Sequence, residues 1–183
     1  DLEWVTLTHS VPEPNALVLR AAGRTVFHTG DWKLDPHPVE GAHYDDKRIL
    51  ELGEQGVEFV VGDSTNATVD GWSGSEADCQ KALLEVIRKQ PNRVAVTCFS
   101  SNTARLASLG DVALKTGRRI SVLGRSLFNY LQTAKSVGYL KNFPDIVPTE
   151  DLDYLPRSEQ LILATGSQGE PRAAMARLAK GEH

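Results

Sequence analysis

The sequence has little of what membrane proteins, disulfide-rich secreted proteins and basic nucleic-acid-binding proteins usually carry. Its two cysteines, Cys79 and Cys98, lie outside any paired metal-binding or redox motif, so we expect small core residues and a reducing compartment. The longest apolar runs, at residues 16–19 and 161–164, fall far short of the roughly 20 residues that a membrane-spanning helix needs. A transmembrane protein is therefore excluded.

The first ten residues contain no Met, no basic segment and no apolar segment, so no signal peptide is visible. We expect the chain to be cut from a longer one. The 183 residues predict one domain or slightly more. With 40% hydrophobic and 24% charged residues, the composition is that of an ordinary globular protein.

The net charge of −4, taken alone, argues against a nucleic-acid partner. However, the charge is unevenly distributed. Residues 1–87 hold 6 basic and 16 acidic side chains, residues 88–141 hold 10 and 1, and residues 142–183 hold 4 and 7. A solvated basic face is the ordinary explanation for a short charged run. Ten basic residues against one acidic residue favour a phosphate-attracting segment more strongly.

Residues 1–60 are predicted to form strands and loops, including a hairpin of residues 15–20 and 25–29. From residue 57 a strand, a loop and a helix follow one another four times, which predicts a parallel sheet covered by helices. The predicted strands end near residues 61, 99, 123 and 164, and the predicted helices cover residues 75–89, 103–116, 126–137 and 171–179.

Several residues mark the ends of these helices. Ser75 and Asp78 resemble a capping box, and Gly117 and Gly138 suit the position after a helix C-terminus. Pro171 suits a first helical turn.

Ligands of open α/β sheets bind beyond the carboxyl ends of the strands, so the strand-to-helix loops are the expected site. These loops contain hydroxyls, amides, glycines and one Arg, at residues 62–66, 99–102, 124–126 and 165–170. Such groups beside helix N-termini suit an oxyanion, most naturally a phosphate. Ser, Thr and Asn also cap helices without binding anything, and the pattern leaves both interpretations open.

His9 and Asp31 each follow a predicted strand, and imidazole nitrogen and carboxylate oxygen are both good zinc ligands. Two such residues do not make a metal site, and near turns they commonly serve in hydrogen bonds or caps. His28, His37 and His43 are further candidates. None has the spacing of helical metal ligands, and we interpret His37 and His43 as surface loop residues.

Six segments together identify a family. They read THSVP, HTGDWK, VGDSTN, CFSSNTAR, LGRSL and TGSQGEP, in this order. In this combination the chain closely resembles the middle of the ribonuclease J family, in the β-CASP branch of the metallo-β-lactamase superfamily. The resemblance covers essentially the whole chain. FSSN stands where FASN is common in the family, and GRSL where GRSM is frequent.

The resemblance implies an α/β fold with two parts. Residues 1–56 would be the end of a metallo-β-lactamase αββα domain, and residues 57–183 most of a parallel-sheet β-CASP domain. It also implies a metal-dependent ribonuclease of RNA processing and decay, a 5′-to-3′ exonuclease with endonuclease activity that hydrolyses phosphodiesters by a two-metal mechanism. The implied cofactor is a pair of Zn²⁺ ions, with Mn²⁺ or Mg²⁺ as alternatives.

The family motifs also imply roles for single residues. His9 would bind one metal, Asp31 would bridge the two metals, and Asp63 would be a catalytic carboxylate beside them. The hydroxyl of Ser101 would hold an RNA phosphate. The residues expected to assist in binding RNA or phosphate are Ser64, Asn66, Asn102, Arg105, Arg125, Gly166, Ser167 and Gln168.

The implied substrate is single-stranded RNA with a 5′-monophosphate. The full-length protein is expected to be a dimer or tetramer in the bacterial cytoplasm. The family's HxHxDH motif is absent here, so we expect this fragment alone to be inactive. The alternatives are a non-catalytic module that binds RNA or phosphate, and a β-CASP nuclease that acts on DNA.

Overall fold

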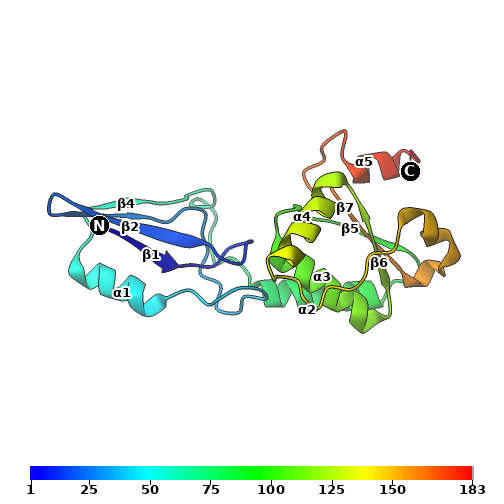
Figure 1. Cartoon of the computed structure of the whole chain (residues 1–183), viewed down its shortest axis with the longest axis horizontal. Helices are drawn as coiled ribbons and strands as arrows, with labels where there is room; N and C mark the ends of the chain where they lie inside the picture. Colours follow the sequence, from blue (N-terminus) through cyan, green and yellow to red (C-terminus); the bar gives the residue numbers. More distant parts are fainter. Residues whose placement is uncertain (183) are drawn as a thin grey trace. The chain divides into compact units, whose positions relative to one another are not determined.

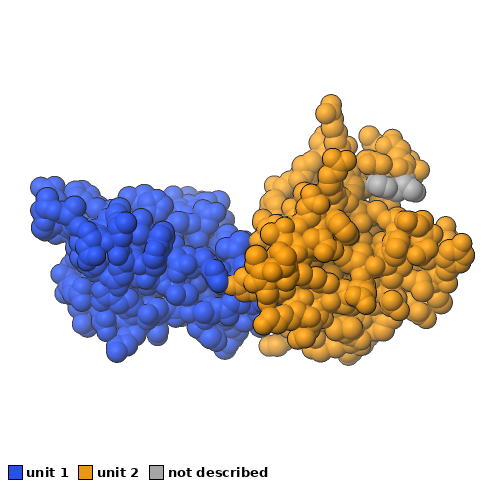
Figure 2. Space-filling model, in the orientation of Figure 1, with its two compact units in different colours: residues 1–77 blue, residues 78–183 orange. Residues whose placement is uncertain are grey.

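The structure is a computed structural model that describes residues 1–182. It forms two compact units, Asp1–Ala77 and Asp78–His183, which Figure 2 shows in separate colours. The division lies later in the chain than the domain boundary predicted after residue 56. The assignment of the two parts to a metallo-β-lactamase domain and a β-CASP domain stays a prediction.

The first unit is built on a four-stranded sheet in the order β1-β2-β3-β4. β1, β2 and β3 are antiparallel neighbours, and β4 runs parallel to β3. The strands are β1 (Leu2–Thr6), β2 (Asn15–Ala21), β3 (Arg24–His28) and β4 (Phe59–Val61). The hairpin of β2 and β3 confirms the prediction from the sequence.

One face of this sheet is covered by helix α1 (Asp46–Gln55), which runs beneath the strands in Figure 1. Alternate residues of β1 and β2, including Val5 and Val18, pack with Leu52 of α1 to form the core of the unit. The other face is apolar and exposed, with Trp4 on β1 and Phe59 on β4 more than half accessible.

Two predictions for the first unit were wrong. Residues 46–55 were expected to be loop but form α1, whose N-terminus is capped by the Asp45 carboxylate accepting a hydrogen bond from the Arg48 N–H. β4 was expected in the second sheet, but its backbone pairs with β3 at Val26, Phe27 and His28.

The second unit has a three-stranded parallel sheet in the order β5-β7-β6, so the last strand of the sequence lies in the middle. Its strands are β5 (Val94–Thr97), β6 (Arg119–Leu123) and β7 (Gln160–Ala164). Its helices are α2 (Glu76–Arg88), which starts in the first unit, α3 (Thr103–Thr116), α4 (Arg125–Ser136) and α5 (Ala174–Ala179). The predicted α/β fold with a parallel sheet is confirmed.

Every residue of β7 is buried, as expected for the central strand of a parallel sheet covered on both faces. Leu106 and Leu109 of α3 and Leu127 and Leu131 of α4 pack in its main core. In Figure 1, α3 and α4 lie beside the strands β6 and β7.

The helix ends agree with most of the predicted signals. Gly117 ends α3 in the left-handed conformation, with φ of 67°. Ser75 caps α2, because its hydroxyl accepts a hydrogen bond from the Ala77 N–H at 3.1 Å. The expected partner Asp78 instead contacts Lys81 at 3.4 Å. Pro171 lies outside α5, which begins at Ala174.

The proline-containing stretch before β7 forms two short 3₁₀ helices, η1 (Thr149–Tyr154) and η2 (Arg157–Glu159). Cys98 is buried in the main core, and burial raises the pKa of its thiol to about 11. Cys79 is only half-buried, so the expectation of two core cysteines holds for Cys98 alone. None of the helices over residues 1–182 has the length and apolar character to span a lipid bilayer.

Candidate functional site

The first unit brings His9, Asp31 and Asp63 to one edge of its sheet. β1, β3 and β4 run in the same direction, so the loops after them emerge together. Hydrogen bonds tie these loops to one another. The Lys33 N–H donates to the Thr8 carbonyl at 2.9 Å, and the Asp63 N–H donates to the Thr29 hydroxyl at 3.2 Å. Three of the predicted site residues thus share one edge.

The side chains at this edge are accessible. Asp31 and Asp63 are exposed, and His9 is half-buried with its Nδ1 hydrogen-bonded to the Ser10 hydroxyl at 3.1 Å. The pKa of Asp63 is lowered, first by the hydrogen bond from the Thr65 hydroxyl and further by the Thr65 N–H and the nearby His9 ring. Asp63 is therefore an ionised carboxylate near neutral pH.

The donor types at this edge suit a divalent metal, since they are one imidazole and two carboxylates. However, no group of three His, Cys, Asp or Glu side chains among residues 1–182 is arranged to hold a metal ion. The fit to a metal is therefore one of ligand chemistry and not of a complete coordination shell.

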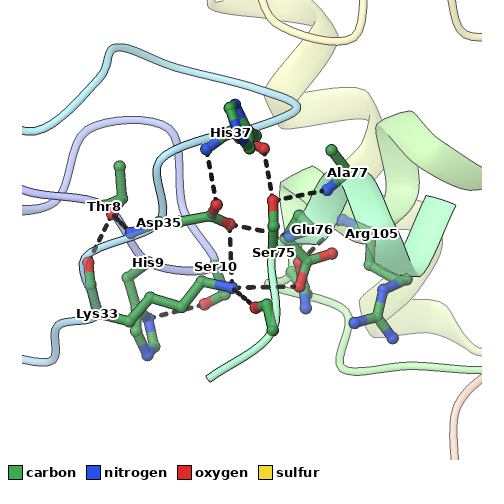
Figure 3. Close-up of polar contacts among 12 residues, drawn as sticks. Thr8, His9, Ser10, Lys33, Asp35, His37, Ser75, Glu76, Ala77 and Arg105 are labelled. Atoms are coloured by element: carbon green, nitrogen blue, oxygen red, sulfur yellow. Dashed lines mark hydrogen bonds and ion pairs between the residues drawn. The ribbon is translucent and has the colours of Figure 1, made fainter. Parts of the chain in front are cut away.

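A buried carboxylate, Asp35, orders the loop that follows β3 (Figure 3) and was not predicted from the sequence. One carboxylate oxygen accepts the N–H of His37 at 2.9 Å, and the other accepts the N–H of Glu76, the first residue of α2, at 2.9 Å. Lys33 contacts Asp35 at 3.2 Å and Glu76 at 3.9 Å. We call these four residues the Asp35 network.

The contacts of the Asp35 network lower the pKa of the Asp35 carboxyl. Burial by itself would raise the pKa of Asp35, but the N–H groups of Glu76 and His37 and the Lys33 ammonium outweigh it. The pKa falls from the ordinary 3.8 to about 2. The charged carboxylate therefore fixes the segment that begins two residues after Asp31, and with it the local path of the chain at the edge.

Ser64 and Asn66 line an open pocket in the same unit, together with Asp63. Two tryptophans outside the predicted site, Trp32 and Trp72, also line this pocket. Trp32 follows the predicted ligand Asp31 directly, and this position beside a motif residue was the one signal available in the sequence.

The remaining predicted residues gather in the second unit, at the edge formed by the carboxyl ends of β5, β6 and β7. The loop of β7 leaves from the middle of this edge, between the loops of its two neighbours. The loops of β6 and β7 are in contact, because a Cβ atom on Gly124 would lie 2.7 Å from the Thr165 side chain. The structure thus brings together Ser101, Asn102 and Arg105 after β5, Arg125 after β6, and Gly166, Ser167 and Gln168 after β7.

The capping interpretation is confirmed for one of these residues, and phosphate binding stays a prediction for the others. Asn102 is a helix cap, since its side-chain oxygen accepts the Arg105 N–H at 2.9 Å. The side chains of Ser101, Arg125 and Ser167 are exposed. Helix α4 starts after Gly124 without any side-chain cap, so no capping side chain satisfies its first N–H groups.

Part of the basic segment serves the fold and not the surface. Arg118 is 5% exposed and donates hydrogen bonds to the carbonyls of Ile87, Gln90, Asn92 and Gln160, at 2.6 to 3.4 Å. These groups lie at the amino ends of the strands, opposite the predicted phosphate-binding loops. The net charge of +9 over residues 88–141 is therefore larger than the positive charge that lies at the loop edge.

Comparison with known proteins agrees with the motifs. Residues 91–183 match the family described as "Ribonuclease J, beta-CASP domain". The ribonuclease J of Sinorhizobium meliloti is 41% identical over 99% of this chain, and that of Synechocystis is 40% identical over all of it. The ribonuclease J of Thermus thermophilus is 38% identical over the whole chain.

The chain covers 32%, 29% and 32% of these three relatives, about a third of their length. A crystal structure of a protein of unknown function from Enterococcus faecalis aligns with 91% of this chain and 42% of its own, with a TM-score of 0.60 at 16% identity. That likeness supports the fold alone. On the family match over residues 91–183, this chain belongs to the ribonuclease J family, whose β-CASP domain those residues form.

Proposed function

We propose that this chain is the central, RNA-holding part of a metal-dependent ribonuclease that hydrolyses phosphodiester bonds in single-stranded RNA. The observation that carries the proposal is the meeting of three polar loops at the carboxyl ends of β5, β6 and β7. Membership of the ribonuclease J family supplies the substrate class.

The loop edge has the groups that a phosphate chain needs. The open N-terminus of α4 offers backbone N–H groups and the positive end of the helix dipole. Arg125, the first residue of α4, adds an exposed guanidinium, and Ser101 and Ser167 add hydroxyls. Contacts of this kind hold a backbone without reading its bases, as a nuclease of broad sequence range requires.

His9 and Asp31 are proposed as metal ligands, with Asp63 beside them as a catalytic carboxylate. When bound, a pair of divalent cations such as Zn²⁺, Mn²⁺ or Mg²⁺ supplies hydroxide near neutral pH and stabilises the charge of the displacement. Asp31 is exposed, and the Asp35 network fixes the chain just after it, which supports this proposal. Because the described residues hold no three-ligand group, further ligands are needed to complete the site.

The same proposal covers the mode of cleavage, the oligomeric state and the cellular location of the protein. They are 5′-to-3′ exonuclease action from a 5′-monophosphate, endonuclease activity in RNA processing and decay, a dimer or tetramer, and a bacterial cytoplasmic location. The names of the relatives support a ribonuclease, and the chain spans about a third of their length.

A non-catalytic RNA-binding module is the second candidate, and the lack of a three-ligand group among residues 1–182 favours it for this chain alone. The two candidates differ in what Asp31 does. In a protein of the relatives' full length that carries this chain, Asp31→Ala should abolish cleavage of 5′-monophosphorylated RNA and leave RNA affinity within about twofold. Asp70→Asn, a charge change at an exposed position, is the matched control.

Cleavage by the Asp31→Ala protein at the wild-type rate would refute the metal role. A competition between RNA and DNA strands of the same sequence tests the substrate class. Stronger displacement by DNA than by RNA would indicate a nuclease that acts on DNA and would contradict the proposed ribonuclease.

A further inference from the structure

The first unit contains an open pocket of its own, in addition to the loop edge of the second unit. It measures about 380 Å³ and lies between the loop after β3, which contributes Trp32 and Leu34, and the loop after β4, which contributes Asp63, Ser64 and Trp72. This volume is in the lower part of the range of small-molecule pockets, about 300–1,000 Å³. All of its lining residues belong to one unit.

The two tryptophans give the pocket an aromatic surface. Trp72 is 95% exposed, so its indole ring contributes nothing to the core. Trp32 is 37% exposed and held in place, because its indole N–H donates to the Asp63 carbonyl at 3.2 Å. An aromatic ring that the fold leaves in water is a free stacking surface.

The charge of the pocket argues against a phosphate as its occupant. Lys33 is the single basic residue in the lining, and it is engaged by Asp35 at 3.2 Å, Glu76 at 3.9 Å and the Gly74 carbonyl at 3.2 Å. Asp63 adds a carboxylate, one oxygen of which accepts hydrogen bonds from Thr65. Among its lining residues, the pocket therefore offers a carboxylate and no unengaged cation, which favours a neutral group over a phosphate as its occupant.

The same groups suit a nucleobase. A base has a π-face that stacks on indole, and its edge carries N–H donors that a carboxylate accepts. The hydroxyl of Ser64 and the amide of Asn66 offer further polar partners at the rim. The lining thus combines a flat apolar surface with acceptors and donors at its border.

We propose that this pocket binds one nucleobase of single-stranded RNA, stacked on Trp72 against the wall formed by Trp32. This inference rests on the proposed function, and it adds a base-holding site in the first unit to the phosphate-holding loops of the second.

The test measures the affinity of the chain for fluorescein-labelled oligo(A) of about ten nucleotides by anisotropy. Trp72→Ala should weaken binding about 5- to 150-fold, the loss expected for one base–aromatic stack. Trp72→Phe, which keeps an aromatic face, should restore most of the affinity. Trp4→Ala is the matched control, because Trp4 is also exposed, at 70%, but lies on β1 outside the pocket.

A second probe separates the base from the backbone. Wild type and Trp72→Ala should bind an abasic ribose-phosphate strand of the same length equally well. Far-UV circular dichroism should be the same for all variants, since Trp72 is outside the core. Equal affinity of wild type and Trp72→Ala for oligo(A) would overturn the inference and leave the proposed function intact. Failure of the wild type to bind any RNA would overturn both.

Discussion

Replacing Asp35 with Asn tests whether the buried carboxylate holds the first unit together. Asn keeps the shape but loses the charge that accepts the N–H groups of His37 and Glu76 and faces the Lys33 ammonium. The pKa of Asp35 is 3.8 in the unfolded chain and about 2 in the folded protein. At 1.36 kcal/mol per pKa unit, this difference corresponds to roughly 2 kcal/mol of stability at pH 7.

The sign of the pH dependence follows from the lowered pKa. The contribution of Asp35 is complete above pH 3.8 and is lost as the pH falls toward 2. Roughly half of it should be gone at pH 3. The difference in unfolding free energy between wild type and Asp35→Asn should therefore shrink from pH 7 to pH 3.

Urea unfolding followed by tryptophan emission measures this difference in the right part of the molecule, because Trp4, Trp32 and Trp72 are the only tryptophans and all lie in the first unit. Asp70→Asn is the control for loss of a surface charge. A difference below about 0.5 kcal/mol at pH 7, the size of an ordinary surface substitution, would refute the reasoning. A difference of the same size at pH 7 and pH 3 would refute the electrostatic part of it.

Two further predictions concern the second unit. Arg118→Leu removes the guanidinium donor from four backbone carbonyls and should destabilise the unit by about 3 kcal/mol, whereas the exposed Arg119→Leu should cost little. Urea unfolding followed by far-UV circular dichroism compares the two variants. Gly124→Ala adds a Cβ 2.7 Å from Thr165 at φ of 122°, so it should cost more in the same assay than Gly117→Ala, which meets open space at φ of 67°. Equal losses within either pair would contradict the assigned contacts.

The local pattern of the sequence predicted the second unit well. Residues 103–116 were predicted as a helix and form α3 with the same bounds, because apolar residues at helical spacing lie between Asn102 and Gly117, which both act as end signals. The three β–loop–α segments after residue 90 were also placed correctly, apart from the start of α5. The predicted phosphate-binding loops therefore meet as the parallel topology requires.

The first unit was harder to predict because its decisive contacts are distant in the chain. Whether β4 joins one sheet or the other depends on its pairing with β3, more than thirty positions earlier, and not on its own apolar residues. Asp35 satisfies the first N–H of α2 across 41 residues, so no capping pattern near Glu76 could reveal it. Helix α1 was not predicted because its sequence is mostly polar. Asp45, a residue type common at helix N-caps, was the available indication of its start.

The most direct test of the central claim, that RNA passes over the carboxyl-end loops of the second unit, compares Arg125→Ala with Arg119→Ala. Both residues are exposed, but Arg125 lies at the carboxyl-end edge of the parallel sheet and Arg119 begins β6 at the opposite edge. Affinity for single-stranded RNA is measured across a range of salt concentrations. Arg125→Ala should weaken binding and reduce the slope of log K against log salt by about 0.7, the value for one lost phosphate contact, while Arg119→Ala leaves the slope unchanged. An unchanged slope for Arg125→Ala, or an equal loss in both variants, would contradict the account.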